Sequence, residues 1–338
     1  MGRVFDISGK KTVQNPSSLP MMLLTLLAGL FCWWLEYSVS ANYPLHTTSS
    51  TPLWNRMTGL LSDKWSVYLA GALLLCGMAV IVQYTNYYLI LFREKTKLPF
   101  LLFLLLNSAN FGFVPLRPIS VAFFFLALCM VELFKAYQKE KTGMTPGSAY
   151  KATFWLGVGS LIWIHLLWLI PLFWYGMYQF RLLNFRTFMA SLLGVITMYW
   201  IVAGWYVWKY DFTGLTDTFR PLTDFDFVPL REYLNLTQLA PLATAFLYTV
   251  IPGFILRFHN INAGLRTRRF ISFLLASTRY LLLFLFLFDA EAADFLCIFF
   301  IPVSLLMTYL FFNTSRNVSL YYYLLLACSL ILQVVHYV

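Results

Sequence analysis

The stretch Phe154–Phe180, FWLGVGSLIWIHLLWLIPLFWYGMYQF, decides how this chain is threaded. It has 27 residues and contains no Asp, Glu, Lys or Arg. One membrane-spanning helix needs about 20 apolar residues and two need about 40, so the stretch is too long for one crossing and short for two. Because the choice reverses the side of every later loop, it fixes the topology of the whole protein.

The composition is that of an integral membrane protein. Of the 338 residues, 60% are hydrophobic and 11% are charged, and the mean hydropathy is +0.71. A soluble domain with this composition would expose large apolar patches. We therefore expect an all-α, polytopic bundle of membrane helices with no soluble domain. The net charge of +10 is spread over short loops, so nucleic acid is not an expected partner.

Basic residues flank the stretch on both sides. The loop before it contains Lys135, Lys139, Lys141 and Lys151, and the loop after it contains Arg181 and Arg186. Short loops rich in Lys and Arg stay on the cytoplasmic side of a membrane. Both flanks are therefore predicted to be cytoplasmic, and the stretch must double back as a hairpin. We place the break at Pro171, which lacks a backbone donor and disfavours helix at Ile170.

With the hairpin counted as two helices, the chain is predicted to cross the membrane about eleven times. The other spans lie near 18–40, 65–91, 98–113, 118–134, 188–208, 237–256, 270–288, 294–312 and 318–337. The loops on the predicted cytoplasmic side then hold 17 Lys and Arg against six on the other side, and three acidic residues against eight. This distribution places the N-terminus in the cytoplasm and the C-terminus outside.

Four segments follow from this threading. Residues 1–17 form a cytoplasmic N-terminus, 18–208 a transmembrane module with short hairpins, 209–236 an extracytoplasmic loop, and 237–338 a C-terminal transmembrane module. Each half of the central hairpin, as a helix of about 12 residues, is too short to cross about 30 Å of hydrocarbon. We expect it to borrow residues from its linkers or to pack in the interior, because a turn at membrane depth needs protein around it.

Ionisable residues inside membrane spans are costly and therefore mark candidate sites. Arg279 lies near the middle of the span 270–288, where insertion scales assign about 2.5–3.5 kcal/mol to an arginine. It is predicted either to form a structural ion pair or snorkel, or to bind an anion or phosphate. Glu36 lies at the outer end of the first span, beyond Trp33 and Trp34. It is either a solvated boundary group or a catalytic base or metal-ligating acid.

Three further residues are candidates for substrate binding. Arg117 lies at the outer tip of the hairpin formed by the spans 98–113 and 118–134, and Arg220 lies in the second large outer loop. Both either pair with outer acidic residues or bind phosphate through their planar guanidinium groups. His165 lies inside the central hairpin, either as a hydrogen-bonded interior histidine or as a proton relay or ligand contact.

The sequence predicts no metal site and shows no cofactor motif. Its four histidines are dispersed, and its five cysteines lie in apolar runs without CxxC spacing. One further acid, Glu132, lies close to the inner membrane boundary. We expect it to pair with Lys135, three residues later on the same predicted helix.

The helix hairpins resemble those of the GT-C class of membrane glycosyltransferases, which use polyprenyl-phosphate-linked sugars. The resemblance covers roughly residues 17–208 and rests on LPFLLFLLLNSANFGFVPLRPISVAFFFLALCMVELF, a basic loop, and FWLGVGSLIWIHLLWLIPLFWYGMYQFR. Enzymes of that class carry an acidic residue in the first outer loop, which acts as base or metal ligand near the donor phosphate. The resemblance implies this role for Glu36, whereas the next acid in the chain is Asp63.

Across most of its length the chain also looks like a family of bacterial multi-spanning inner-membrane proteins, a likeness that implies a location and no activity.

Three classes of function compete. A GT-C-like transferase in envelope glycoconjugate assembly is favoured by the hairpins and the outer arginines, with membrane lipids and a polyprenyl-phosphate-linked sugar as partners. A non-catalytic membrane subunit of an envelope or secretion complex is favoured by aromatic-rich helices, which make good surfaces for protein partners. A transporter or lipid flippase is the third alternative, typically marked by repeats with paired broken helices.

Overall fold

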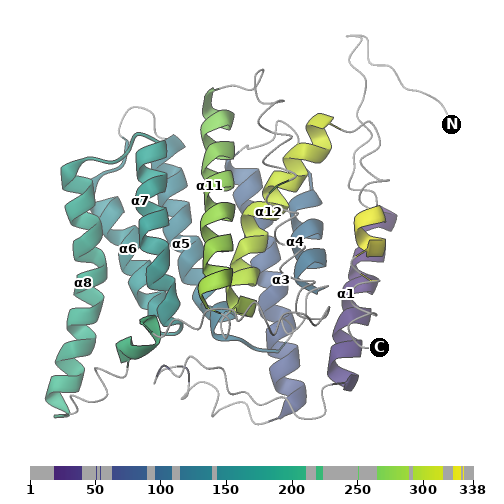
Figure 1. The fold of residues 1–338 in the computed structure, drawn as a ribbon, viewed down its shortest axis with the longest axis horizontal. Coiled ribbons are helices and arrows are strands. Elements are labelled where there is room, and N and C mark those ends of the chain that lie inside the picture. The colour runs from purple at the N-terminus through teal and green to yellow at the C-terminus, as the bar shows by residue number, and fades with distance from the viewer. Residues whose placement is uncertain are drawn as a thin grey trace.

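The computed structural model describes residues 19–39, 51, 54, 63–89, 96–108, 115–138, 143–210, 218–223, 250, 265–288, 292–314, 323–328 and 330. The α-helices with defined bounds are α1 (Leu19–Val39), α3 (Lys64–Leu89), α4 (Leu98–Ser108), α5 (Pro118–Gln138), α6 (Pro146–Ser160), α7 (Ile170–Gln179), α8 (Phe185–Trp208), α11 (Leu265–Leu287) and α12 (Ala292–Thr314). Two 3-10 helices, η1 (Ile164–Leu169) and η2 (Arg220–Leu222), join them. The helices run alongside one another (Figure 1), so the all-α prediction is confirmed for this part of the chain.

Six of the described helices are long and apolar enough to cross a membrane: α1, α3, α5, α8, α11 and α12. The chain is therefore a multi-pass integral membrane protein. The shorter helices α4, α6 and α7 lie between the long ones in the sequence. The count of eleven spans and the sides of the two termini stay predictions.

The stretch Phe154–Phe180 doubles back, as its flanking charges predict. α6 ends at Ser160, and the backbone at Trp163 is extended (φ −135°, ψ 100°) before η1 leads into α7. The predicted break at Pro171 is wrong, because Ile170 has helical angles (φ −59°, ψ −48°). Pro171 instead lies in the first turn of α7. A backbone N–H group in that turn has no acceptor within the helix, so a proline there breaks no hydrogen bond.

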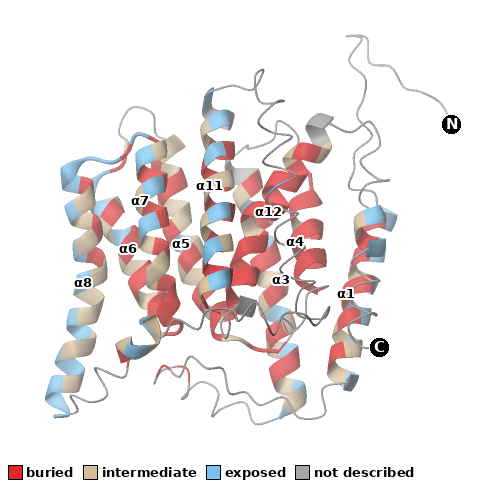
Figure 2. Cartoon of the chain, in the orientation of Figure 1, coloured by how far each residue is buried: buried red, intermediate tan, exposed pale blue. Residues whose placement is uncertain are grey.

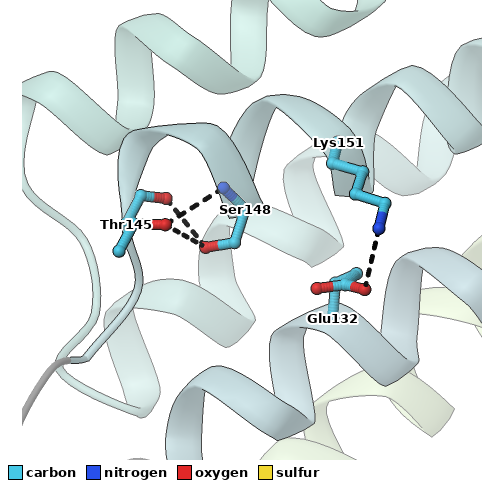
Figure 3. Close-up of polar contacts among 4 residues, drawn as sticks. All are labelled: Glu132, Thr145, Ser148 and Lys151. Atoms are coloured by element: carbon cyan, nitrogen blue, oxygen red, sulfur yellow. Dashed lines mark hydrogen bonds and ion pairs between the residues drawn. The ribbon is translucent and has the colours of Figure 1, made fainter.

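The first helix of this hairpin reaches its length by extending into the basic loop. It begins one residue after Thr145, whose hydroxyl accepts a hydrogen bond from the backbone N–H of Ser148 at 3.2 Å (Figure 3). Further along α6, the Lys151 ammonium lies 3.8 Å from the Glu132 carboxylate of α5. Glu132 thus pairs between two helices, and the predicted pairing with Lys135 is wrong.

The centre of the bundle is built from α12 and the short helix α4. α12 packs against α4, α5 and α11, and α4 also packs against α1 and α3. Both central helices are buried along most of their length (Figure 2). α4 has only 11 residues, and protein on several sides lets so short a helix lie at membrane depth. By contrast, α8 packs on α6 and exposes Trp200, Trp205 and Trp208, a surface that suits lipid.

Several predicted segments lie mostly outside the described residues. The spans 237–256 and 318–337 are described only at residues 250, 323–328 and 330. The N-terminus 1–17 and most of the loop 209–236 also lie outside this part of the chain.

Candidate functional site

The end of the bundle that holds η1 gathers most of the predicted site residues. Because successive helices run in opposite directions (Figure 1), this end also contains the last turns of α1, α4, α8 and α11 and the first turns of α3, α5 and α12. We call it the η1 end. It corresponds to the side that the sequence predicts to be extracytoplasmic.

Arg117 forms an ion pair with Asp294 at the η1 end. Its guanidinium Nη1 donates to the Asp294 Oδ1 atom at 3.2 Å, and the two side chains are 16% and 1% exposed. Arg117 directly precedes α5, and Asp294 lies in the first turn of α12. The positive end of the helix dipole also favours a carboxylate in that turn. The pair therefore joins the tip of the α4–α5 hairpin to the start of α12.

His165 lies near the start of α12 in an aromatic shell. The side chain is 2% exposed, and its ring lies 4.9 Å from Phe288 and 6.1 Å from Phe295, between centroids. Its Nε2 atom is 3.1 Å from the carbonyl oxygen of Pro221. A carbonyl oxygen only accepts, so Nε2 carries the proton in this hydrogen bond. His165 thus matches the interior, hydrogen-bonded alternative of the sequence analysis.

Arg220 reaches the same end through its neighbour Pro221, because both belong to η2. The Arg220 side chain is exposed, and its carbonyl accepts a hydrogen bond from the N–H of Thr223 at 3.0 Å. Arg117, His165 and Arg220 therefore come from three distant segments to one end of the bundle.

Two hydrogen bonds fasten further segments to the η1 end. The Thr51 hydroxyl donates to the Ile162 carbonyl at 2.8 Å, which ties Thr51 to the turn of the central hairpin. The hydroxyls of Ser160 and Tyr199 lie 2.7 Å apart and join α6 to α8.

Asp294, the partner of Arg117, is not among the candidate residues predicted from the sequence. Its signal is present in the sequence, because it stands at the start of the long apolar run 295–312 on the side where Arg117 was placed. An acid in the first turn of a helix is a common feature, however. Only the packing of α12 beside the α4–α5 hairpin shows that these two charges meet.

Glu36 lies near the η1 end of α1 and belongs to a different part of the bundle. It is 3% exposed and shares a buried face of α1 with Thr25, Ala28 and Cys32. The Glu36 side chain is therefore surrounded by protein. α1 packs against α4, whereas the Arg117–Asp294 pair joins the start of α5 to the start of α12.

Arg279 lies away from the η1 end. It is exposed on the middle of α11, eight residues before the helix ends at Leu287. Of the five candidate residues, Arg279 therefore stands apart from the η1 end, whereas Arg117, His165, Arg220 and Glu36 lie at or near that end.

Two hollows in the bundle are lined by apolar groups. A cavity of about 90 Å³ lies among α3, α5, α7, α11 and α12, with Thr85 and Ser277 as its polar lining residues. A groove of about 410 Å³ lies between α1 and α3 and is lined by Trp33, Trp34 and Trp65 with two tyrosines and aliphatic residues. None of the five candidate residues lines either hollow.

The polar contacts described at the η1 end join groups of the chain to one another. Within the described ranges, no group of three or more His, Cys, Asp or Glu side chains is placed to hold a metal ion. The charge of Arg117 is balanced by Asp294, and the imidazole of His165 is bonded to a backbone carbonyl. Comparison of the chain with family models, curated proteins and solved structures finds no match.

Proposed function

We propose that this protein is a non-catalytic membrane subunit of a multi-protein assembly in a bacterial inner membrane. The observation that carries the proposal is the construction of the η1 end, where Arg117 and His165 bind groups of their own chain. A site for a sugar or a phosphate needs polar groups that converge on an open space. Neither described hollow has such a lining, and both suit apolar partners.

The outer surface of the bundle supports the same proposal. α1, α3 and α8 expose large apolar side chains, among them Leu27, Trp65 and Trp200. Both lipid and a protein helix can cover such an apolar surface. It does provide room for partner helices on more than one side of the bundle.

A GT-C-like transferase of polyprenyl-phosphate-linked sugars is the second candidate, and the burial of Glu36 favours it. A buried carboxylate is costly, and costly ionisable groups in membrane spans often serve a function. In this reading Glu36 is the base or metal ligand near the donor phosphate. Arg117 would then have to leave Asp294 to bind the phosphate.

Purification of the full chain from native membranes in a mild detergent tests the first candidate. We expect a partner protein to be recovered at constant stoichiometry through size-exclusion chromatography. A monodisperse monomer without a partner would contradict the proposal.

The variant Glu36→Gln separates the two candidates. We expect the Glu36→Gln protein to complement fully a strain that lacks the wild-type protein. Glutamine keeps the shape of the glutamate side chain and removes only its charge. A catalytic base at this position predicts instead a loss of about 10²–10⁴-fold in sugar transfer. The measurement is turnover of polyprenyl-phosphate-linked sugar in membranes, with protein level and partner recovery followed in parallel. Lost turnover at unchanged protein level would favour the enzyme.

A further inference from the structure

Arg279 presents a charge toward the membrane from the middle of an apolar helix. It is exposed, whereas other faces of α11 pack against α7 and α12. The apolar window of this helix runs from Thr267 to Leu287, and its midpoint, Ser277, is two residues away from Arg279. No hydrogen bond or ion pair joins Arg279 to any residue that the structure describes. An arginine in the middle of a membrane span is costly.

Snorkelling does little to relieve this cost. Leu287, at the nearer end of α11, is about 12 Å away along the helix axis, and Leu265, at the other end, is about 21 Å away. The Cα–Cβ bond of a helical residue tilts toward the helix N-terminus. The Arg279 side chain therefore leads toward the more distant end, and its guanidinium stays among apolar groups.

The residues around Arg279 form a stripe that suits close helix packing. Ser272, Ala276, Arg279, Leu283 and Phe286 are spaced by four, three, four and three residues, so they share one face of α11. All are exposed except Ala276, which is partly exposed, and Figure 2 shows a pale blue stripe along this helix. Small residues four apart, here Ser272 and Ala276, let a second helix approach closely in a membrane. We call these five residues the α11 stripe.

We propose that the α11 stripe binds a transmembrane helix of a different protein, and that an Asp or Glu in the middle of that helix pairs with Arg279. This inference rests on the proposed function as a membrane subunit. A carboxylate is the best complement because it accepts two parallel hydrogen bonds from a guanidinium. Each of two costly membrane charges is then offset by the other.

No acidic residue of the predicted spans pairs with Arg279 in the part of the chain that the structure describes. Its acidic residues within expected spans are Glu36, Glu132 and Asp294, of which Glu132 pairs with Lys151 and the other two are buried. The predicted spans 237–256 and 318–337 contain no acidic residue. A second copy packed through the same stripe would bring two guanidinium groups together. Charge complementarity therefore points to a different protein.

A defined peptide tests this chemistry on the full chain in lipid nanodiscs. The probe is a synthetic transmembrane helix of leucine and alanine with one glutamate at its centre, and the control peptide has leucine there. A photo-crosslinking amino acid replaces Leu283 of the stripe or, as the matched control, the exposed Leu193 of α8. We expect the glutamate peptide to label position 283 about tenfold more than the leucine peptide does, with no such difference at position 193.

The variant Arg279→Leu identifies the cause of that preference. Leucine inserts into a membrane more readily than arginine, so lost labelling is not explained by failed insertion. We expect the preference for the glutamate peptide to disappear in Arg279→Leu and to be replaced by a preference for an arginine-centred peptide in Arg279→Glu. Equal labelling by both peptides, or a preference that survives Arg279→Leu, would overturn the inference.

The same crosslinker positions in native membranes separate this inference from the proposed function. We expect a protein with a mid-membrane Asp or Glu to be labelled from position 283 and not from 193, with about a tenfold loss in Arg279→Leu. A partner recovered equally with Arg279→Leu and labelled from neither position would overturn the inference and leave the proposed function intact. Absence of any partner overturns both, and labelling of a second copy overturns the inference.

Discussion

The variant Arg117→Leu is expected to lose about 3–5 kcal/mol of stability, since removing one partner of a buried ion pair leaves the other charge uncompensated. The Asp294 carboxylate, 1% exposed, would remain buried without the guanidinium that lies 3.2 Å away. The start of α12 would then have to open or take up a proton. We expect unfolding of the purified full chain at markedly lower SDS in mixed micelles, or a large drop in its thermal midpoint.

The reverse variant provides the control. Asp294→Asn should cost clearly less, because asparagine can still accept a hydrogen bond and the Arg117 side chain is partly exposed. The double variant Arg117→Leu/Asp294→Asn should regain part of the loss of Arg117→Leu, as a double-mutant cycle measures for interacting residues. Additive losses in the double variant would show that the pair does not hold the α4–α5 hairpin to α12.

Gly194→Ala is the second change with a large expected effect, because α6 and α8 touch through this glycine. A Cβ atom placed on Gly194 would clash with the Thr153 hydroxyl oxygen and would lie 2.5 Å from the Tyr150 carbonyl oxygen. Backbone atoms cannot move aside as a flexible side chain does. Overpacking of this kind costs about 1–3 kcal/mol, and Gly194→Leu should separate the two helices. The same unfolding titration measures the loss.

Gly204→Ala on the same helix is the matched control. A Cβ atom there meets nothing within 4 Å, so its unfolding midpoint should stay close to that of the wild type. Equal effects of the alanine variants at 194 and 204 would contradict the close approach of α6 and α8.

The sequence was sufficient to predict the hairpin but not its internal geometry. Lys and Arg on both flanks of Phe154–Phe180 indicate on which side of the membrane each flanking loop lies, and they can be read directly from the sequence. The place of the break depends on packing. Pro171 is compatible both with a break and with the first turn of a helix, and the contacts of η1 with its neighbours select the second.

The residues of the candidate site could largely be predicted from the sequence, but the groups that they contact could not. Positions of ionisable residues relative to apolar runs identified Arg117, His165 and Glu36 as unusual. Which groups they meet depends on helix order in the bundle, which one sequence does not specify. The Arg117–Asp294 pair joins residues 177 positions apart, and Arg279 faces outward because α7 and α12 occupy other sides of α11.

Single-cysteine labelling tests most directly whether the chain doubles back between α6 and α7. Cysteines are introduced singly at the exposed positions Gly147, Asn184 and Tyr210, after replacement of the native Cys32, Cys76, Cys129, Cys297 and Cys328. In intact cells a membrane-impermeant maleimide should label position 210, and it should reach positions 147 and 184 only after the membrane is permeabilised. Labelling of 147 and 184 from opposite sides of the membrane would contradict the hairpin and the placement of every later helix.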